Sequence, residues 1–275
     1  MASNILVTGA NGDIGRSVVN QALAQGKRVF ATVRNKAHCE TFEPHNELSF
    51  ILMHLDDADS IRSAYSQIDK RLAGQALDGV IHCAAIQSPA CVEFMKPEHL
   101  EQTLRVNTIG SLLVMQQAFS RLRISGGNLV IASSIWGFVT GPALCPYAAS
   151  KWALEALIRS AQCETKGMGF HICAANIGAV QSRMLHAHVD SIDQMLADGD
   201  AEMHELYEAC FQRHAAMVRK FNSLATSADN VGLKLLGIID RSKPSRNYTI
   251  GIDAHVMRFL NWLLPRSALD KVLSG

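Results

Sequence analysis

Asn4-Ile5-Leu6-Val7-Thr8-Gly9-Ala10-Asn11-Gly12-Asp13-Ile14-Gly15 is the stretch that decides the fold of this chain. Its apolar first half predicts a short buried strand, and its glycines predict a tight turn. Helical spacing of apolar residues then predicts a helix over Arg16–Gln25, and Arg28–Val33 reads as a second strand. A strand, glycine turn, helix and strand within about thirty residues predict a dinucleotide site, because such a turn lets a pyrophosphate approach the helix N-terminus. The alternative is a tight turn without a ligand.

The turn and the end of the second strand supply the predicted nucleotide contacts. NAD sites usually place Asp or Glu after that strand, whereas a nearby Arg suits the 2′-phosphate of NADP. Here Val33 is followed by Arg34 and by no acidic residue, so we predict NADP(H), with NAD possible. The alternative is that Arg34 is only a surface residue. The predicted contacts are Gly9, Asn11, Gly12, Asp13, Ile14, Gly15 and Arg34.

Tyr147 and Lys151 carry the predicted chemistry. Residues four apart lie on one face of a helix, so the lysine places a positive charge beside the phenol. A nearby cation favours the phenolate and is expected to lower the tyrosine pKa from its usual value of about 10. The pair then becomes a candidate general acid and base for an alcohol oxygen.

Composition narrows the class of protein. The chain has 275 residues, 48% of them hydrophobic, and a formal net charge of +1, which fits one α/β domain and argues against a nucleic-acid-binding surface. Seven scattered cysteines without a C-x-x-C pair indicate reduced thiols in a cytoplasmic setting. We expect no metal site, no signal peptide and no membrane span.

Strands and helices alternate along the remainder of the chain. This pattern predicts a single doubly wound parallel sheet, a Rossmann-type α/β fold with helices on both faces, over residues 1–275. Further strands are predicted at Leu48–His54, Val80–Ala85, Asn128–Ala132, His171–Ile177 and Asn247–Ile252. Further helices are predicted at Asp59–Leu72, Pro97–Leu122 (in one or two pieces), Tyr147–Thr165 and Val231–Ile239.

Two segments stand apart from this alternation. Residues 182–226 are long and rich in Met and His, and they follow a core strand. Because ligands bind beyond the carboxyl ends of such strands, we expect this segment to cover a substrate; the alternative is a packed surface subdomain. Val256–Leu264 is amphipathic, and we expect it to lie in the core and not against a neighbour or a membrane.

Taken together, these motifs resemble the short-chain dehydrogenase/reductase family over nearly the whole chain. The matches occur in the family's order: the turn Thr8–Gly15, Asp56, Cys83-Ala84-Ala85, Asn107, Ser134, Tyr147-x-x-x-Lys151 and Ile177–Ser182. Three features depart from the usual pattern. The spacing Gly-x-x-Gly-x-x-Gly is closer to the sugar-nucleotide-modifying members. Cys83-Ala84-Ala85 stands where the family often has Asn-Ala-Gly, and Ile177 stands where a proline is usual.

The resemblance implies a role for each matched residue. Tyr147 donates or takes the proton, Lys151 lowers its pKa and holds the nicotinamide ribose, and Ser134 bonds the substrate oxygen. Asn107 supports a proton-relaying water chain through its backbone. Further implied cofactor contacts are Asp56, Ala84, Gly178 and Val180. The helices of Asn107 and Tyr147 are those that build dimer interfaces in the family, so a homodimer or homotetramer is expected.

Three functions follow from these features. The leading hypothesis is an NADP(H)-dependent oxidoreductase that interconverts a ketone or aldehyde and an alcohol. Similarity of Val29–Arg34 and of Tyr248–Ala254 to hydroxysteroid and retinol dehydrogenases implies a lipophilic substrate. The second hypothesis, favoured by the glycine spacing, is a nucleotide-sugar epimerase or dehydratase with tightly bound NAD. The third is a non-catalytic nucleotide-sensing protein, which the presence of both Tyr147 and Lys151 disfavours.

Overall fold

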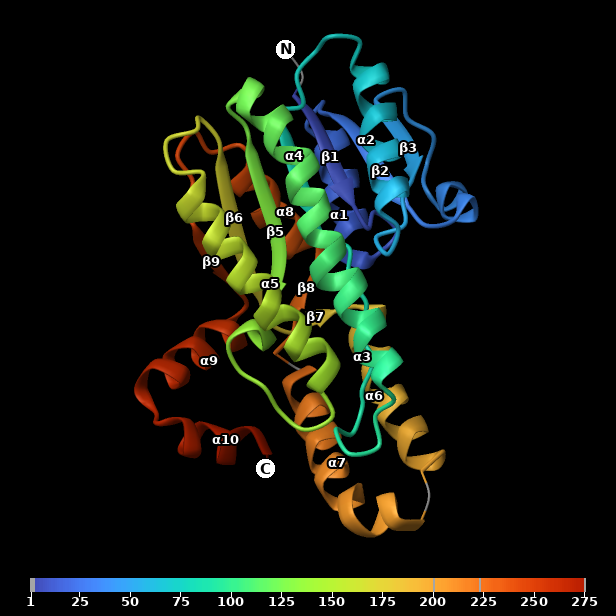
Figure 1. Ribbon diagram of the computed structural model, residues 1–275, viewed down its shortest axis with the longest axis vertical. Helices are drawn as coiled ribbons and strands as arrows, with labels where there is room; N and C mark the ends of the chain where they lie inside the picture. The colour runs from blue at the N-terminus through green and yellow to red at the C-terminus, as the bar shows by residue number, and fades with distance from the viewer. Residues whose placement is uncertain (1–2, 200, 223, 275) are drawn as a thin grey trace.

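The computed structural model describes residues 3–199, 201–222 and 224–274. Its centre is a seven-stranded sheet in the order β3-β2-β1-β4-β5-β6-β9, with every neighbouring pair parallel (Figure 1). This confirms the predicted doubly wound sheet. The strands are β1 (Asn4–Thr8), β2 (Arg28–Val33), β3 (Leu48–Leu52), β4 (Gly79–His82), β5 (Asn128–Ser134), β6 (His171–Ile177) and β9 (Asn247–Ile250).

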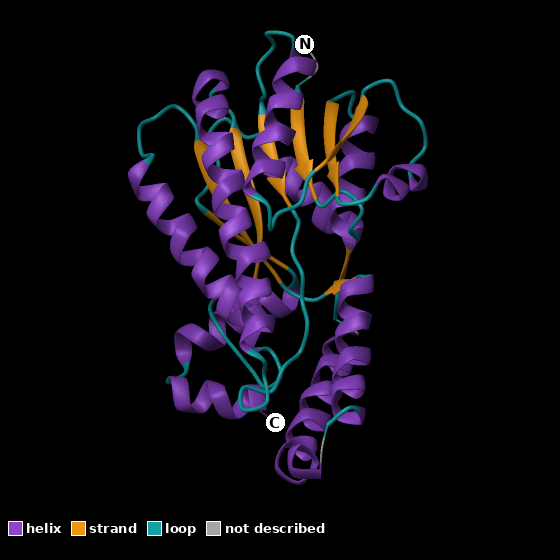
Figure 2. Cartoon of the chain, turned by 45° about the vertical axis from the view of Figure 1, so that its right-hand side comes forward, coloured by secondary structure: helices purple, strands orange, loops and turns teal. Residues whose placement is uncertain are grey.

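Helices cover both faces of this sheet, as its apolar strands require. One face packs against α1 (Asp13–Ala24) and α8 (Ala228–Ile239). The other packs against α2 (Ala58–Leu72), α4 (Ser111–Ser125) and α5 (Cys145–Glu164). Each interface is a separate cluster of buried apolar side chains, so the sheet lies between two hydrophobic cores. Figure 2 shows the strands with helices on both sides of them.

The glycine turn lies where the strand order reverses, between β1 and its two neighbours β2 and β4. Gly9 has a φ of +66°, which favours glycine, and a Cβ there would lie 2.7 Å from the Cα of Ala84. A Cβ on Gly15 would lie 2.2 Å from the Gly9 carbonyl oxygen. These close approaches bring the start of α1 against β1 and place its N-terminus beyond the carboxyl ends of the strands, where this fold binds ligands.

Several element boundaries differ from the predicted ones. Helix α1 begins at Asp13 rather than Arg16, because Gly12 supplies its extended N-cap residue. Strand β4 ends at His82, where Thr8 Oγ1 and His82 Nδ1 lie 2.7 Å apart. The predicted helix from Pro97 is divided into α3 (Pro97–Leu104) and α4 by a π-helical turn, η2 (Arg105–Gly110). Turns of this kind are frequent at functional sites.

The segment after β6 forms a helical layer beyond the sheet. The short strands β7 (Val180–Gln181) and β8 (Thr226–Ser227) pair with each other and enclose α6 (Arg183–Ala197) and α7 (Ala201–Asn222). Figure 1 shows these two helices below the sheet, at the end where α5 begins. The remaining short elements are η1 (Lys36–Thr41) and η3 (Ile135–Gly137).

The expectation that Val256–Leu264 lies in the core is wrong for half of the helix. In α9 (Ile252–Leu263), Phe259 is 55% and Trp262 78% exposed. Only the opposite side, with Met257, packs against Val139 and α10 (Arg266–Ser274). The reason is that α9 follows the last strand at the edge of the sheet and has neighbours on one side only. None of the described helices has the length and apolar character that a membrane-spanning helix needs.

The turn that joins β1 to α1 gives a direct test of this packing. Gly15→Ala should reduce the free energy of unfolding by roughly 1–3 kcal/mol, because the added Cβ overlaps a backbone oxygen. Gly237→Ala is the matched control: this exposed glycine lies within α8 and has open space around it, so alanine should stabilise the chain by about 0.5–1 kcal/mol. Urea unfolding measures both changes. An unchanged stability for Gly15→Ala would contradict the close approach.

Candidate active site

A cavity of about 330 Å³ opens at the carboxyl ends of β1, β5 and β6. The glycine turn borders one end of the cavity, and α6 and α7 border the other. The end of β5 and the first two turns of α5 lie between them. The sheet, the turn and the added helices therefore share one enclosed space.

Three of the predicted catalytic residues line this cavity together. Ser134 is the last residue of β5, while Tyr147 and Lys151 lie on successive turns of α5. Ser134 is the side chain whose hydrogen bonding lowers the pKa of Tyr147. The Lys151 ammonium lies 5.6 Å from the centre of the Tyr147 ring and donates to the Ala132 carbonyl at 3.1 Å. The parallel pairing of β5 with β6 fixes Ser134 beside Ile177, at the start of the β6–β7 segment.

Burial has the largest effect on the pKa of Tyr147. Desolvation raises the pKa of Tyr147 to about 12, and the hydrogen bond with Ser134 offsets only part of that rise. The expectation that Lys151 lowers the phenol pKa below its usual value is therefore wrong for the protein without nucleotide. The physical reason is that burial of a side chain that is only 7% exposed disfavours the charged phenolate more than the neutral phenol. Tyr147 is thus a protonated donor at neutral pH.

The buried ammonium of Lys151 depends on a polar relay behind it. Burial lowers the pKa of Lys151 to about 8, and the carboxylate of Glu155 opposes that shift. Asn176 donates to Glu155 Oε1 at 2.5 Å and accepts from the Arg258 guanidinium at 2.7 Å. The relay runs from α5 across β6 to α9, so three elements position one carboxylate near the lysine.

Asn107 has a structural position next to this group. Its side chain donates to the Ile86 carbonyl and accepts from the Ile86 amide, both at 2.8 Å, and also donates to Ser150 Oγ. Its carbonyl accepts from Ser111 Oγ at 2.6 Å. The amide therefore joins the loop after β4 to α5, one residue before Lys151. Asn107 itself does not line the cavity among the described residues.

The glycine turn fits the pyrophosphate of a dinucleotide. Gly12 provides no side-chain cap to α1, which leaves the helix N-terminus for an anion. Side chains at positions 9 and 15 would collide with the backbone that gives the turn its shape. The carboxylate of Asp13 in the first turn is paired with Arg183, whose Nε donates to Asp13 Oδ1 at 2.9 Å. The guanidinium of Arg183 therefore offsets the negative charge of Asp13, which would otherwise repel an anion.

The predicted cofactor residues divide into two groups. Three of them do not line the cavity among the described residues: Arg34 and Asp56 are exposed beyond β2 and β3, and Ala84 lies behind Gly9. The nucleotide's adenosine end would have to extend past the cavity to reach Arg34. The residues that do line it are Gly9, Asn11, Gly12, Asp13, Ile14, Gly15, Tyr147, Lys151, Gly178 and Val180.

Two site residues escaped the reasoning from sequence. Arg183, at the start of α6, donates to both Asp13 and the Asn11 carbonyl and so joins the far segment to the glycine turn. Asp253, at the start of α9, is buried, and its Oδ2 accepts from the Ala179 amide at 2.6 Å. A Cβ on Gly178 would overlap the Asp253 carboxylate. The sequence signal for Asp253 was its place in the Tyr248–Ala254 stretch that resembles hydroxysteroid and retinol dehydrogenases.

The other cavity-lining side chains come from the predicted covering segment 182–226 and from the C-terminal helices. Met184, Leu185, His188, Met217 and Val218 line it from α6 and α7, and Met257 and Leu273 line it from α9 and α10. Most of the pocket between the reacting group and these helices is therefore apolar.

Comparison with known proteins agrees with this geometry. The family model described as short chain dehydrogenase matches residues 3–193. A 3-amino-tetrahydro-pyrrolizinone reductase from Xenorhabdus hominickii is 27% identical, over 91% of this chain and 87% of its own length. Retinol dehydrogenase 7 from Mus musculus is 23% identical, over 98% of this chain and 87% of its own.

A solved structure shares the fold over the whole chain. This short chain dehydrogenase from Burkholderia cenocepacia J2315, in complex with NADP, superposes with a TM-score of 0.76 at 17% identity and covers 100% of this chain and 98% of its own. With the family match extending over more than half of the sequence, the chain belongs to the short-chain dehydrogenase family of NAD(P)-dependent oxidoreductases.

Proposed function

We propose that this chain is an NADP(H)-dependent carbonyl reductase and alcohol dehydrogenase that acts on a lipophilic ketone or aldehyde, with Tyr147 as general acid and base. The observation that carries the proposal is that Ser134, Tyr147 and the buried Lys151 line one cavity together with the glycine turn. When bound, the nucleotide supplies or accepts the hydride.

The residues supply what hydride transfer to a carbonyl needs. Negative charge develops on the carbonyl oxygen, and two hydroxyl groups aimed at it, from Ser134 and Tyr147, stabilise that charge. Tyr147 then gives up its proton, and the Lys151 cation favours the resulting phenolate. The apolar walls of the cavity exclude water from the reacting carbon. Asn107 holds α5 in place and supports proton exchange with solvent through its backbone.

Two observations support NADP over NAD: the residue that follows β2, and the cofactor found in one solved structure with the same fold. Arg34 follows β2 with no acidic residue beside it and is exposed, so a 2′-phosphate could bind its guanidinium. The B. cenocepacia structure with the same fold contains NADP.

Support for a lipophilic substrate comes from the far end of the cavity. Met184, Met217, Val218 and Met257 make this end apolar, and α6 and α7, within residues 182–226, cover it. Methionine side chains adapt to irregular apolar shapes. A mouse retinol dehydrogenase is among the relatives over nearly the whole chain.

We also infer a homodimer or homotetramer in the cytoplasm. Ile109 and Ile124 are 47% and 83% exposed around α4, and Trp152 is 42% exposed on α5, which leaves apolar surface on the two helices expected to form the interface. All seven cysteines are free thiols, as a reducing compartment favours.

The alternative of a nucleotide-sugar epimerase or dehydratase rests on the glycine spacing alone. Against it, the described part of the chain places only helices α6 to α10, three short strands and their loops after β6, which is less than a separate substrate domain.

Replacing the proposed acid gives the first test. Tyr147→Phe should reduce kcat for ketone reduction by about 10²- to 10⁴-fold, because proton donation is lost. NADPH binding, measured by quenching of protein fluorescence, should remain. Retention of more than a tenth of the wild-type rate would exclude Tyr147 as the proton donor.

Cofactor choice tests Arg34. Arg34→Ser should raise the KM for NADPH by about 10- to 100-fold, which corresponds to losing a charge-assisted contact, and should leave the KM for NADH nearly unchanged. Lys36→Ser, a nearby exposed cation, is the control and should have a smaller effect. A wild-type preference for NADH above tenfold would refute the assignment.

The pH profile tests the relay behind Lys151. The lysine cation is present below its pKa of about 8 and is lost as pH rises through it, so reduction should slow on the alkaline side. Glu155→Gln removes the carboxylate that raises this pKa and should move the alkaline limb to lower pH. Glu164→Gln, exposed on the same helix, should leave it in place. An unmoved limb in Glu155→Gln would contradict the relay.

A further inference from the structure

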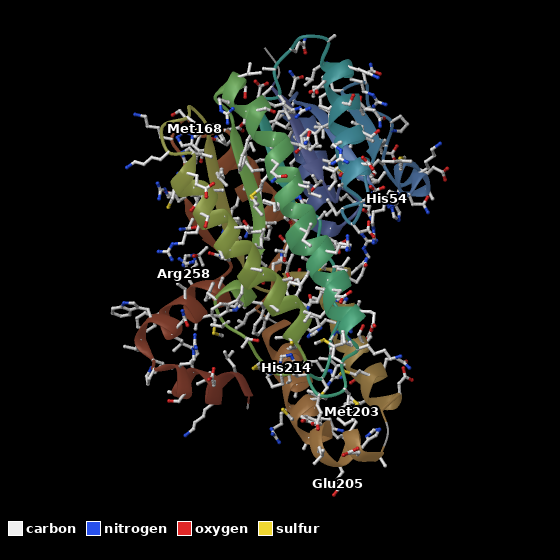
Figure 3. The ribbon with its side chains drawn as sticks, viewed as in Figure 1. His54, Met168, Met203, Glu205, His214 and Arg258 are labelled. Carbon is white, nitrogen blue, oxygen red and sulfur yellow. The ribbon has the colours of Figure 1, made fainter. Side chains whose placement is uncertain are left out.

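Two histidines of the helical layer form a buried pair beside the cavity. His188 on α6 is 4% exposed and His214 on α7 is 1% exposed. Their rings meet edge to face, with centroids 5.9 Å apart and planes at 83°. Figure 3 shows His214 below the sheet, where α7 approaches the loop that precedes α5.

The polar atoms of this pair lack partners. None of the four ring nitrogens has a hydrogen bond to any residue that the structure describes. Burial lowers the pKa of each ring to about 4, so both are neutral at physiological pH. A neutral imidazole has one N–H donor and one acceptor nitrogen. Buried polar atoms left unsatisfied are rare and destabilising, which points to a partner that arrives from elsewhere.

Only one ring of the pair borders the cavity. His188 lines it, in the same space as Tyr147 and Ser134. His214 lies behind, with its Cε1 near the backbone of Gly141. Since no hydrogen bond to a described residue fixes the His188 ring, rotation about its Cβ–Cγ bond can turn a nitrogen toward the cavity, and such terminal torsions are soft. His214 packs against the ring and limits its positions.

We propose that His188 recognises a second, uncharged oxygen function of the substrate, a hydroxyl or a carbonyl, at the end remote from the reacting carbonyl, and that His214 positions the His188 ring. This inference rests on the proposed function and names its substrate class more closely: an apolar skeleton with two oxygen functions. A hydroxyl matches a neutral imidazole because each can both donate and accept.

The charges of the cavity argue against an acidic second group. The lining cations are Lys151, which donates to Ala132, and Arg183, which is paired with Asp13. Met184, Met217 and Val218 line the cavity from the same two helices as the histidines. A carboxylate there would lose its hydration without gaining a cation.

A series of ketones that differ in one hydroxyl tests the proposal. The probes are 2-nonanone and its analogues with one hydroxyl at a carbon from C5 to C9. The charged probe is 8-oxononanoic acid. NADPH oxidation gives kcat/KM for each. One hydroxyl position should raise kcat/KM by about 10- to 100-fold over 2-nonanone, as expected for one or two hydrogen bonds that complete a buried site. The acid should gain nothing.

Variants separate recognition from a structural role. His188→Phe keeps an aromatic ring against His214 and should bring the ratio of kcat/KM for the preferred hydroxyketone to kcat/KM for 2-nonanone down to about one. It should also raise the thermal midpoint of the ligand-free protein, because an unsatisfied polar ring is replaced by an apolar one of similar shape. His188→Gln, with a polar end, should recover part of the preference. His214→Phe should weaken the preference but not remove it.

The outcomes distinguish this inference from the proposed function. If no ketone is reduced with NADPH, the proposed function fails and the inference fails with it. If ketones are reduced but no hydroxyl position is preferred, or the preference survives in His188→Phe, the inference alone is overturned. A lower thermal midpoint for His188→Phe with an unchanged substrate ratio would show an ordered water as the partner and would also overturn it. A gain for the acid, lost in His188→Phe, would replace the uncharged group by an anion.

Discussion

The buried cation of Lys151 is the constraint on which the rest of the site depends. Lys151 is 3% exposed, and a buried ammonium is unfavourable unless it is paired or hydrogen-bonded. Here the Ala132 carbonyl accepts a hydrogen bond from it, and the nearby Glu155 carboxylate stabilises its charge. One partner comes from β5 and the other from α5, and Glu155 is held in turn from β6 and α9. The need to compensate the charge of Lys151 therefore constrains β5, α5, β6 and α9 together. Tyr147 lies one turn before Lys151 on α5, so the same contacts position it.

The same edge of the sheet assembles the nucleotide end. The reversal of strand order beside β1 opens a crevice, and the glycine turn narrows it until only backbone fits between Gly9, Gly15 and Ala84. Parallel strands end together at this edge, so Ser134 on β5 and Gly178 after β6 face the same space. The proposed catalytic residues and the glycine turn are thus adjacent because both lie at the same edge of the sheet. The added helices close the side that the sheet leaves open.

Local patterns in the sequence were sufficient for the sheet and for most of the central site. The alternation of apolar strands and helices predicted the parallel sheet, and the spacing of Tyr147 and Lys151 predicted their shared helix face. What local patterns cannot supply is contact between distant residues: Arg183 meets Asp13, and Asp253 meets Ala179, only after folding. Solvent exposure was equally hidden, which is why α9 was expected in the core and why burial reversed the expected pKa shift of Tyr147.

The contacts of Arg183 link the two ends of the cavity. The guanidinium of Arg183, the first residue of α6, contacts Asp13 and the Asn11 carbonyl in the glycine turn. Both ends of the cavity therefore contact Arg183, and the ion pair of Arg183 with Asp13 is solvent-accessible. Because salt screens exposed charges, a higher salt concentration weakens this contact between α6 and the glycine turn.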